Sequence, residues 1–240
     1  MGFRLQGVNV LRDPAMIQTE EYEMDKPIDV YWQKRLAELK EALEANNFEA
    51  FIAETSADAK RIVLEEIIPK LQVKSISWGG SMTFPATGLY ETLKNRSDIK
   101  VLDTYDRTLS PEEMIERRRQ SLLVDLFITG TNAVAETGKL INLDGVGNRV
   151  AAITFGPKQV IVLVGRNKVV PEVEDAMFRI KNYAAPVNAI RLDRKTPCVA
   201  TSFCEECKSP ERICNSWGIT EKSSPKGRIK IVLINEDLGI

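Results

Sequence analysis

The chain contains no histidine, and this absence removes several kinds of site from consideration. A Ser-His-Asp triad, a Cys-His pair and a histidine-ligated metal cannot be built from the residues present. Any general acid or base must therefore be an aspartate, glutamate, lysine, tyrosine or cysteine.

A charge excess of one sign and long apolar runs are also absent. The 33 basic and 34 acidic residues leave a formal net charge of −1, so the charge balance gives no support to a nucleic-acid partner. The longest strongly apolar run, 160–164, is far shorter than the ~20 residues that a membrane-spanning helix needs. Acidic residues at 20–25 precede any apolar stretch, so no secretory signal is expected. We expect a cytoplasmic protein without a membrane span.

Strands and helices are expected to alternate along most of the chain. The expected strands are 48–53, 75–78, 99–102, 125–129, 139–142, 149–153, 159–164 and 229–234, and the expected helices are 30–45, 56–70, 85–95, 111–119 and 171–182. This alternation indicates an α/β fold with a mostly parallel sheet and helices on both faces.

The domain organisation follows from the same pattern. Residues 1–28 are polar and irregular, which favours an N-terminal arm, with Asp29 capping the first helix. Residues 29–240 are expected to form a single α/β domain, a length that such domains often reach. Residues 196–226 show no sustained periodicity and are expected to form a loop inserted before the last strand.

Every cysteine of the chain lies in this loop, with the spacing C-x5-C-x2-C-x6-C. The candidate metal ligands are Cys198, Cys204, Cys207 and Cys214. Four thiolates in an adaptable loop suit a [4Fe-4S] cluster, which we expect here, and they also suit a structural zinc ion. A redox dithiol or a set of free thiols is the remaining alternative, since structural disulfides are rare in a reducing cytosol.

A glycine-rich turn follows the expected strand 75–78 and precedes a helix. Its candidate ligand-binding residues are Gly79, Gly80, Ser81 and Thr83. Free N–H groups in such a turn and at a helix N-terminus favour a phosphate or carboxylate, and a simple tight turn is the alternative.

Two more polar segments, 129–142 and 145–149, follow or connect expected strands. Their candidate ligand-binding residues are Thr131, Asn132, Asn148 and Arg149. Arg149 suits a bidentate contact with a carboxylate or phosphate, although a surface ion pair would use it equally well. Because histidine is absent, Glu136 is the expected catalytic base or nucleophile, the alternative being a solvated side chain beside a turn.

The segments 125–138, 147–152, 155–158 and 164–170 together resemble the LUD-domain proteins, the lactate-utilisation protein C or YkgG-like family. The segments 78–83 and 231–239 fit the same pattern. This resemblance implies a fold similar to the sugar-phosphate isomerase, CoA-transferase and folate cyclo-ligase superfamily, with ligands over the carboxyl ends of strands. Some family members belong to an iron–sulfur system that oxidises L-lactate to pyruvate with separate protein partners. The shortest members lack a cysteine motif, so the four-cysteine loop departs from the family pattern.

The sequence therefore predicts a LUD-like protein of lactate or related organic-acid utilisation. It is expected to bind a small anionic metabolite and an iron–sulfur cluster, and to act with redox partner proteins as a subunit of an L-lactate-oxidising system. One alternative is an autonomous isomerase- or transferase-type enzyme that uses Glu136 and a structural zinc ion. Another is a non-catalytic assembly subunit, and a homo-oligomer is compatible with each.

Overall fold

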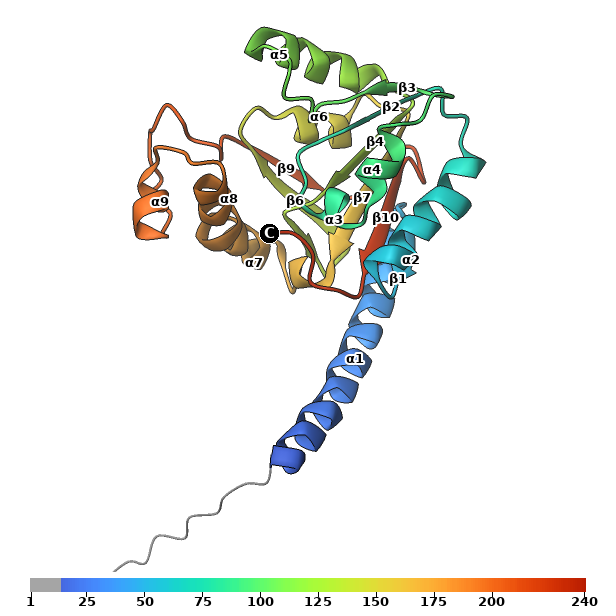
Figure 1. Cartoon of the computed structure of the whole chain (residues 1–240), viewed down its shortest axis with the longest axis vertical. Helices are drawn as coiled ribbons and strands as arrows, with labels where there is room; N and C mark the ends of the chain where they lie inside the picture. Colours follow the sequence, from blue (N-terminus) through green and yellow to red (C-terminus); the bar gives the residue numbers. More distant parts are fainter. Residues whose placement is uncertain (1–13) are drawn as a thin grey trace, which may run out of the picture.

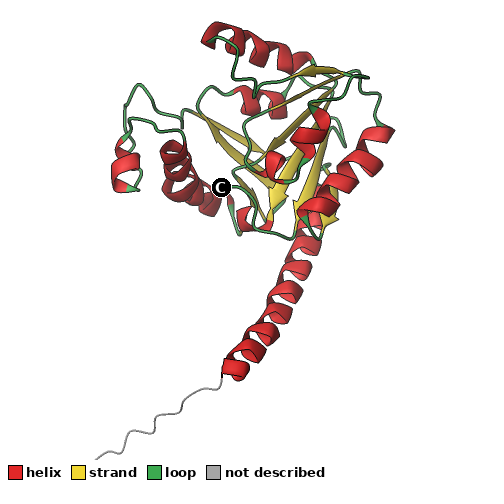
Figure 2. Ribbon diagram, viewed as in Figure 1, coloured by secondary structure: helices red, strands yellow, loops and turns green. Residues whose placement is uncertain are grey.

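A six-stranded parallel sheet forms the centre of the structure, a computed structural model that describes residues 14–240 (Figures 1 and 2). Its strands lie in the order β1 (Glu49–Ala53), β10 (Ile229–Ile234), β7 (Gln159–Gly165), β4 (Leu126–Gly130), β2 (Ser75–Trp78) and β3 (Lys100–Leu102). All five pairings are parallel. The predicted α/β fold with a mostly parallel sheet is confirmed.

Helices cover both faces of this sheet, as the near-continuous apolar strands require. On one face, Val160, Val162 and Val164 of β7 share a core with α1 (Pro14–Ala45) and α6 (Asn148–Thr154). On the other face, Ile161 and Leu163 share a core with α2 (Ser56–Arg61), α3 (Thr83–Ala86) and α4 (Leu89–Leu93). Successive residues of one strand thus point into different cores.

A smaller mixed sheet packs beside the first. Its order is β8 (Val169–Val170), β5 (Ala133–Ala135), β6 (Lys139–Asp144) and β9 (Ser216–Thr220). Val134 and Leu140 face the core that contains α1, whereas Ala133 and Ile141 face α7 (Val173–Arg179). The second sheet is therefore buried on both sides and holds α7 against the body of the protein.

The remaining elements are short apart from α5 (Pro111–Gln120), which begins with a capping box between Ser110 and Glu113. They are η1 (Ile62–Ile67), η2 (Ile68–Lys70), η3 (Ser121–Leu123), η4 (Arg166–Lys168), η5 (Ile180–Ala184), α8 (Ala185–Arg191) and α9 (Pro197–Thr201). No helix in the described part of the chain is long and apolar enough to cross a membrane.

The irregular structure predicted for residues 14–28 is wrong, because these residues belong to α1. Figure 1 shows this helix leaving the body of the protein. Asp29 is therefore inside the helix and does not cap it. Residues 1–13 of the predicted arm lie outside the described residues. The segment has no apolar stripe for a periodicity search to find, although Pro14 at the helix start is a favourable first residue.

Two predictions for the second half of the chain are also wrong. Residues 149–153, expected to be a strand, lie in α6, because Gly147 turns the chain at φ +87° and Val150 N then donates to Asp144 Oδ2 at 3.0 Å. Residues 196–226, expected to be a loop throughout, contain α9 and β9. β9 pairs with β6, and this long-range partner gives a strand to a segment whose own sequence shows no period.

Candidate functional site

Three neighbouring strands of the central sheet end close together, and the polar segments that follow them meet at this edge. Gly79–Ser81 follow β2, Thr131 and Asn132 follow β4, and Lys168 follows β7 within η4. The carboxyl ends of adjacent parallel strands are where α/β proteins usually bind ligands.

The glycine turn after β2 packs directly on β4. A Cβ at Gly130 would lie 2.6 Å from Ser81 Oγ, and one at Gly79 would lie 2.9 Å from a ring carbon of Phe127. Ser81 N donates to the Tyr105 hydroxyl at 3.1 Å, and this hydroxyl donates to Gly79 O at 2.8 Å. Burial raises the pKa of Tyr105 to about 12, so it remains neutral. Tyr105 therefore uses the turn N–H that a bound anion was expected to take.

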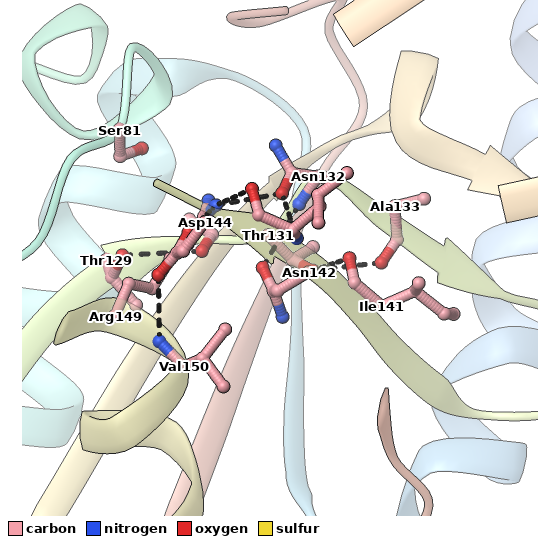
Figure 3. Close-up of polar contacts among 12 residues, drawn as sticks. Ser81, Thr129, Thr131, Asn132, Ala133, Ile141, Asn142, Asp144, Arg149 and Val150 are labelled. Atoms are coloured by element: carbon pink, nitrogen blue, oxygen red, sulfur yellow. Dashed lines mark hydrogen bonds and ion pairs between the residues drawn. The ribbon is translucent and has the colours of Figure 1, made fainter. Parts of the chain in front are cut away.

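Arg149 is the centre of a buried polar network (Figure 3). Its Nε donates to Asp144 Oδ1 at 2.8 Å, and its Nη2 donates to Asn132 Oδ1 at 2.8 Å. Asn132 Oδ1 also accepts from Leu143 N at 2.9 Å. Arg149 is thus not a surface ion pair. It is held rigidly, and Asp144 neutralises its charge.

The other two predicted residues of this region have more modest roles. Thr131 Oγ1 donates to Ala133 O at 2.9 Å and lies 3.1 Å from Ile141 O, which fixes the crossing from β4 to the second sheet. Asn148 is the half-buried first residue of α6.

Lys168, which the sequence reasoning did not select, is a buried cation at the same edge. Its side chain is 3% exposed, and Nζ donates to Thr83 Oγ1 at 2.7 Å. Thr83 Oγ1 in turn donates to Leu238 O at 3.2 Å. Burial, and secondarily the charges of Arg149 and Arg179, lower the pKa of Lys168 to about 7. Its position immediately after the apolar strand β7 was the available signal.

Arg179, at the end of α7, is the third cation. Its Nη1 donates to Asn132 O at 3.0 Å, and its Nε donates to Asn167 O at 3.2 Å. Asn132 thereby bridges Arg179 and Arg149, while Asn167 adjoins Lys168. Burial lowers the pKa of Arg179 from its ordinary value.

We call Arg149, Lys168 and Arg179 the cation cluster. Asp144 pairs with Arg149, and among the ion pairs of the described residues none involves Lys168 or Arg179. The cluster therefore carries more positive charge than its one carboxylate balances. Taking charge out of water is costly unless a counter-charge is present, so this arrangement favours a bound anion.

The structure places Glu136 elsewhere. It follows β5 at the end of that strand opposite to Asn132, where its carboxylate pairs with Arg35 of α1 and its backbone N donates to Val170 O at 2.9 Å. It is not brought together with the cation cluster.

The four cysteines form a second candidate site. All of them line one hollow that opens to solvent. All are half-buried and none is in a disulfide. Lys181, Arg212 and Glu205 contribute charged side chains to its wall, and the apolar part comes from Ala185, Pro186, Ala189 and Ile213.

Loop geometry turns the cysteines toward this hollow. Ser202 and Glu206 adopt left-handed conformations, with φ of +63° and +47°, and so bend the chain on either side of Cys204. The Arg212 side chain then ties the loop together by donating to Cys207 O at 2.8 Å and to Cys214 O at 3.0 Å. Among the side chains of residues 27–240, no three Cys, Asp or Glu are arranged to hold a single metal ion.

Comparison with known families identifies the relationship of the chain. The sequence matches the LUD domain over residues 36–234, which is most of its length. This chain belongs to the LUD domain family. The resemblance seen in the sequence is confirmed, and both candidate sites lie within the matched LUD domain.

Individual relatives of this LUD domain are more distant. Lactate utilization protein B from Oceanobacillus iheyensis is 29% identical over a match that covers 62% of this chain and 39% of that protein. The chain therefore corresponds to well under half of this relative. A solved DUF162 family protein from Deinococcus radiodurans is 14% identical with a TM-score of 0.47, covering 85% of this chain and 98% of its own. Ribose 5-phosphate isomerase A from Methanocaldococcus jannaschii is 18% identical with a TM-score of 0.30, covering 56% and 68%.

Proposed function

We propose that this LUD domain binds a small organic monocarboxylate at the cation cluster and takes part in the utilisation of lactate or a related organic acid. The observation that carries the proposal is the excess of positive charge among Arg149, Lys168 and Arg179 at the carboxyl ends of β4 and β7. A single carboxylate would offset much of that excess and accept hydrogen bonds from the planar guanidinium of Arg179.

The chemistry of the site supports a small ligand. Lys168 and Thr83 are buried, and the polar groups around them are a hydroxyl and amides. The naming of the relative as a lactate utilization protein agrees with a hydroxy or oxo acid. Because the chain spans only part of that relative, we assign it one component of such a system rather than the whole oxidation.

We further propose that the cysteine hollow holds a [4Fe-4S] cluster. The donor set fits, because four thiols face one space and histidine is absent. A structural zinc ion would use the same four thiolates. A cluster spreads its thiolates around a larger body, and the positive charges of Lys181 and Arg212 on the wall would balance them. Such a cluster passes single electrons, which would suit work with iron–sulfur redox partner proteins.

The anion site is tested by titration calorimetry of the full chain with L-lactate. Binding is expected, with a loss of ten-fold or more in Arg179→Gln, since one hydrogen-bonded charge contributes roughly 1.5–3 kcal/mol. Arg191→Gln is the matched control, because Arg191 is exposed on α8 and bonds only to Asn188. No binding by the wild type, or equal binding by Arg179→Gln, would contradict the site.

The cysteine site is tested by iron, sulfide and zinc analysis of protein purified without oxygen. We expect about four irons per chain, with a broad visible band that bleaches on reduction. Cys207→Ser should lose iron, whereas Glu205→Gln, which lines the same hollow without a thiol, should keep it. One zinc and no colour would identify a structural metal site instead. No described contact favours an autonomous enzyme built on Glu136, since that carboxylate is paired with Arg35.

A further inference from the structure

Lys168 has the surroundings of a reactive amine rather than of a structural ion pair. Its Nζ is buried, its hydrogen-bond partner is the Thr83 hydroxyl, and no carboxylate of the described residues lies within ion-pair distance. A lysine retained for charge alone would be expected to reach a carboxylate or water, because an unpaired buried ammonium is costly.

The two neighbouring guanidiniums add to this effect. Arg179 is bonded to Asn167 O, one residue before Lys168, and Arg149 is linked to Arg179 through Asn132. Burial and these two positive charges together bring the pKa of Lys168 to about 7, so a large fraction of the amine is uncharged at neutral pH. Burial and adjacent cations are the two devices by which enzymes activate a lysine as a nucleophile toward carbonyl groups.

The cations also indicate which class of ligand would react with the Lys168 amine. A 2-oxo acid carries a carboxylate next to its ketone, so a carboxylate on the Arg179 guanidinium would direct the adjacent C2 carbonyl toward the neighbouring side chains. A hydroxy acid of the same length would use the carboxylate contact but offers no carbonyl to Nζ. The same site therefore distinguishes the two ligand classes by chemistry rather than by size.

We propose that Lys168 forms an imine with a small 2-oxo acid bound at the cation cluster. Nζ attacks C2 of the oxo acid, the C–O bond breaks, and the carbonyl oxygen leaves as water with the two amine protons. No atom is oxidised or reduced, and no other reactant is needed. The inference rests on the proposed anion site and names the substrate class of that site.

The segment after β10 lies against this amine. Leu238 O accepts from Thr83, Leu238 N donates to Asn167 Oδ1 at 3.1 Å, and a Cβ at Gly239 would lie 3.1 Å from Lys168 Nζ. A carbonyl carbon reaches Nζ only when Leu238 and Gly239 move aside. Adduct formation is therefore expected to be slow and to favour the smallest acids.

The experiment uses the full chain, pyruvate and sodium borohydride, with intact-mass measurement followed by peptide mapping. Borohydride reduces an imine to a stable amine, so one pyruvate adduct on the peptide that contains Lys168 is expected. Lys168→Arg should lose the adduct almost completely, and Lys226→Arg, at an exposed lysine, should keep it. Peptide mapping of the wild type gives the answer even if Lys168→Arg fails to fold.

Three outcomes overturn the inference: no adduct in the wild type, an adduct on another lysine, or an adduct that persists in Lys168→Arg. L-lactate separates this failure from failure of the proposed function, because lactate cannot form an imine. Lactate binding without a pyruvate adduct removes the imine and leaves the anion site intact. Neither lactate binding nor an adduct removes both.

Discussion

Replacing Lys168 by methionine is expected to stabilise the fold at neutral pH while it abolishes the function that we propose. Methionine has a similar length, is unbranched and fills irregular apolar space without a charge. The native lysine must keep its ammonium group in a site where burial and two arginines oppose it. Exchanging such a group for an apolar one commonly stabilises a protein.

The magnitude follows from the pKa of Lys168, which falls from its ordinary value of 10.5 to about 7. Each unit corresponds to ~1.36 kcal/mol between the protonation states, so the full shift sets an upper bound of about 5 kcal/mol. Loss of the hydrogen bond to Thr83 reduces that stabilisation by about 1 kcal/mol. We therefore expect Lys168→Met to raise the free energy of unfolding by about 2 to 4 kcal/mol near pH 6.5.

The pH dependence of this stability difference shows whether the charge of Lys168 causes it. The folded lysine releases its proton near pH 7, whereas the unfolded chain keeps it until about pH 10.4, so the unfolded state binds more protons between these values. Stability of the wild type relative to Lys168→Met must then rise with pH across that window, and the gap should nearly close by about pH 10.

Urea denaturation at about pH 6.5, 8 and 9.5, followed by tryptophan fluorescence, measures this difference in stability. Trp78 is a suitable probe because it is fully buried in the core that contains α3 and α4. Lys226→Met, an exposed control, should show a small difference that does not change with pH. A gap of constant size at every pH, or a methionine variant less stable than the wild type at pH 6.5, would refute the assignment of Lys168 as a charge held in an unfavourable site.

Two further changes test the fold around the sites. Asp125→Asn should lower the free energy of unfolding by about 2 kcal/mol at pH 7, because the ion pair with Lys158 and the hydrogen bonds from Lys74 and Ser75 lower the pKa of Asp125 to about 2. Urea titrations should show this loss shrink as the pH falls from about 4 to about 2. Gly138→Ala should lower the melting temperature by several degrees, since φ is +76° and a Cβ would lie 2.6 Å from Ala42 O, whereas Gly80→Ala, where no atom lies within 4 Å, should not.

The central sheet could be predicted because its longest strands, β7 and β10, are apolar and its strands alternate with helical segments. Residues 159–164, apolar on both faces, indicated a central strand, and β7 lies between β10 and β4. The helix at 111–119 was signalled by acids in its first turn and bases in its last, and α5 spans Pro111–Gln120. These signals are local, so tertiary context was not needed to read them.

Only β6 of the second sheet was expected, at 139–142, because the other three strands depend on distant partners. β8 has two residues and β5 has three, which is too short for a periodic pattern. β9 is a strand because β6 binds it. The same limitation applies to α6, since its first turn is set by the Asp144 carboxylate rather than by any cap within the helix.

The candidate residues also differ in whether local sequence or tertiary contacts identify them. Arg149 and Asn132 were selected as individual polar residues after strands. The network in which Arg149 donates to both Asn132 and Asp144 is a tertiary feature. Lys168 and Arg179 come from separate elements and become one cluster only through backbone carbonyls that the fold brings together. A cysteine spacing, in contrast, is visible in the sequence. The four cysteines line one hollow, and their role as metal ligands stays a prediction.

The cation cluster and the cysteine hollow are connected by one short stretch of backbone and by one hydrogen bond. Arg179 contacts Asn132 at the cluster, and Lys181, two residues later in the π-helical segment η5, lines the hollow. Asp144, the partner of Arg149, accepts at its backbone O from Asn215 N at 2.8 Å, and Asn215 follows Cys214.

We therefore expect that movement of either charged network displaces groups at the other. Binding of an acid that draws Arg179 toward its carboxylate would change the position of Lys181 beside the thiols, and π-helical turns of this kind often occur at functional sites. Such coupling is reciprocal by thermodynamic necessity, so the state of the cysteines must alter affinity for the acid by the same factor by which the acid alters the cysteine site. The same titration with lactate before and after alkylation of the thiols measures that factor, and equal affinities would show that the two sites act independently.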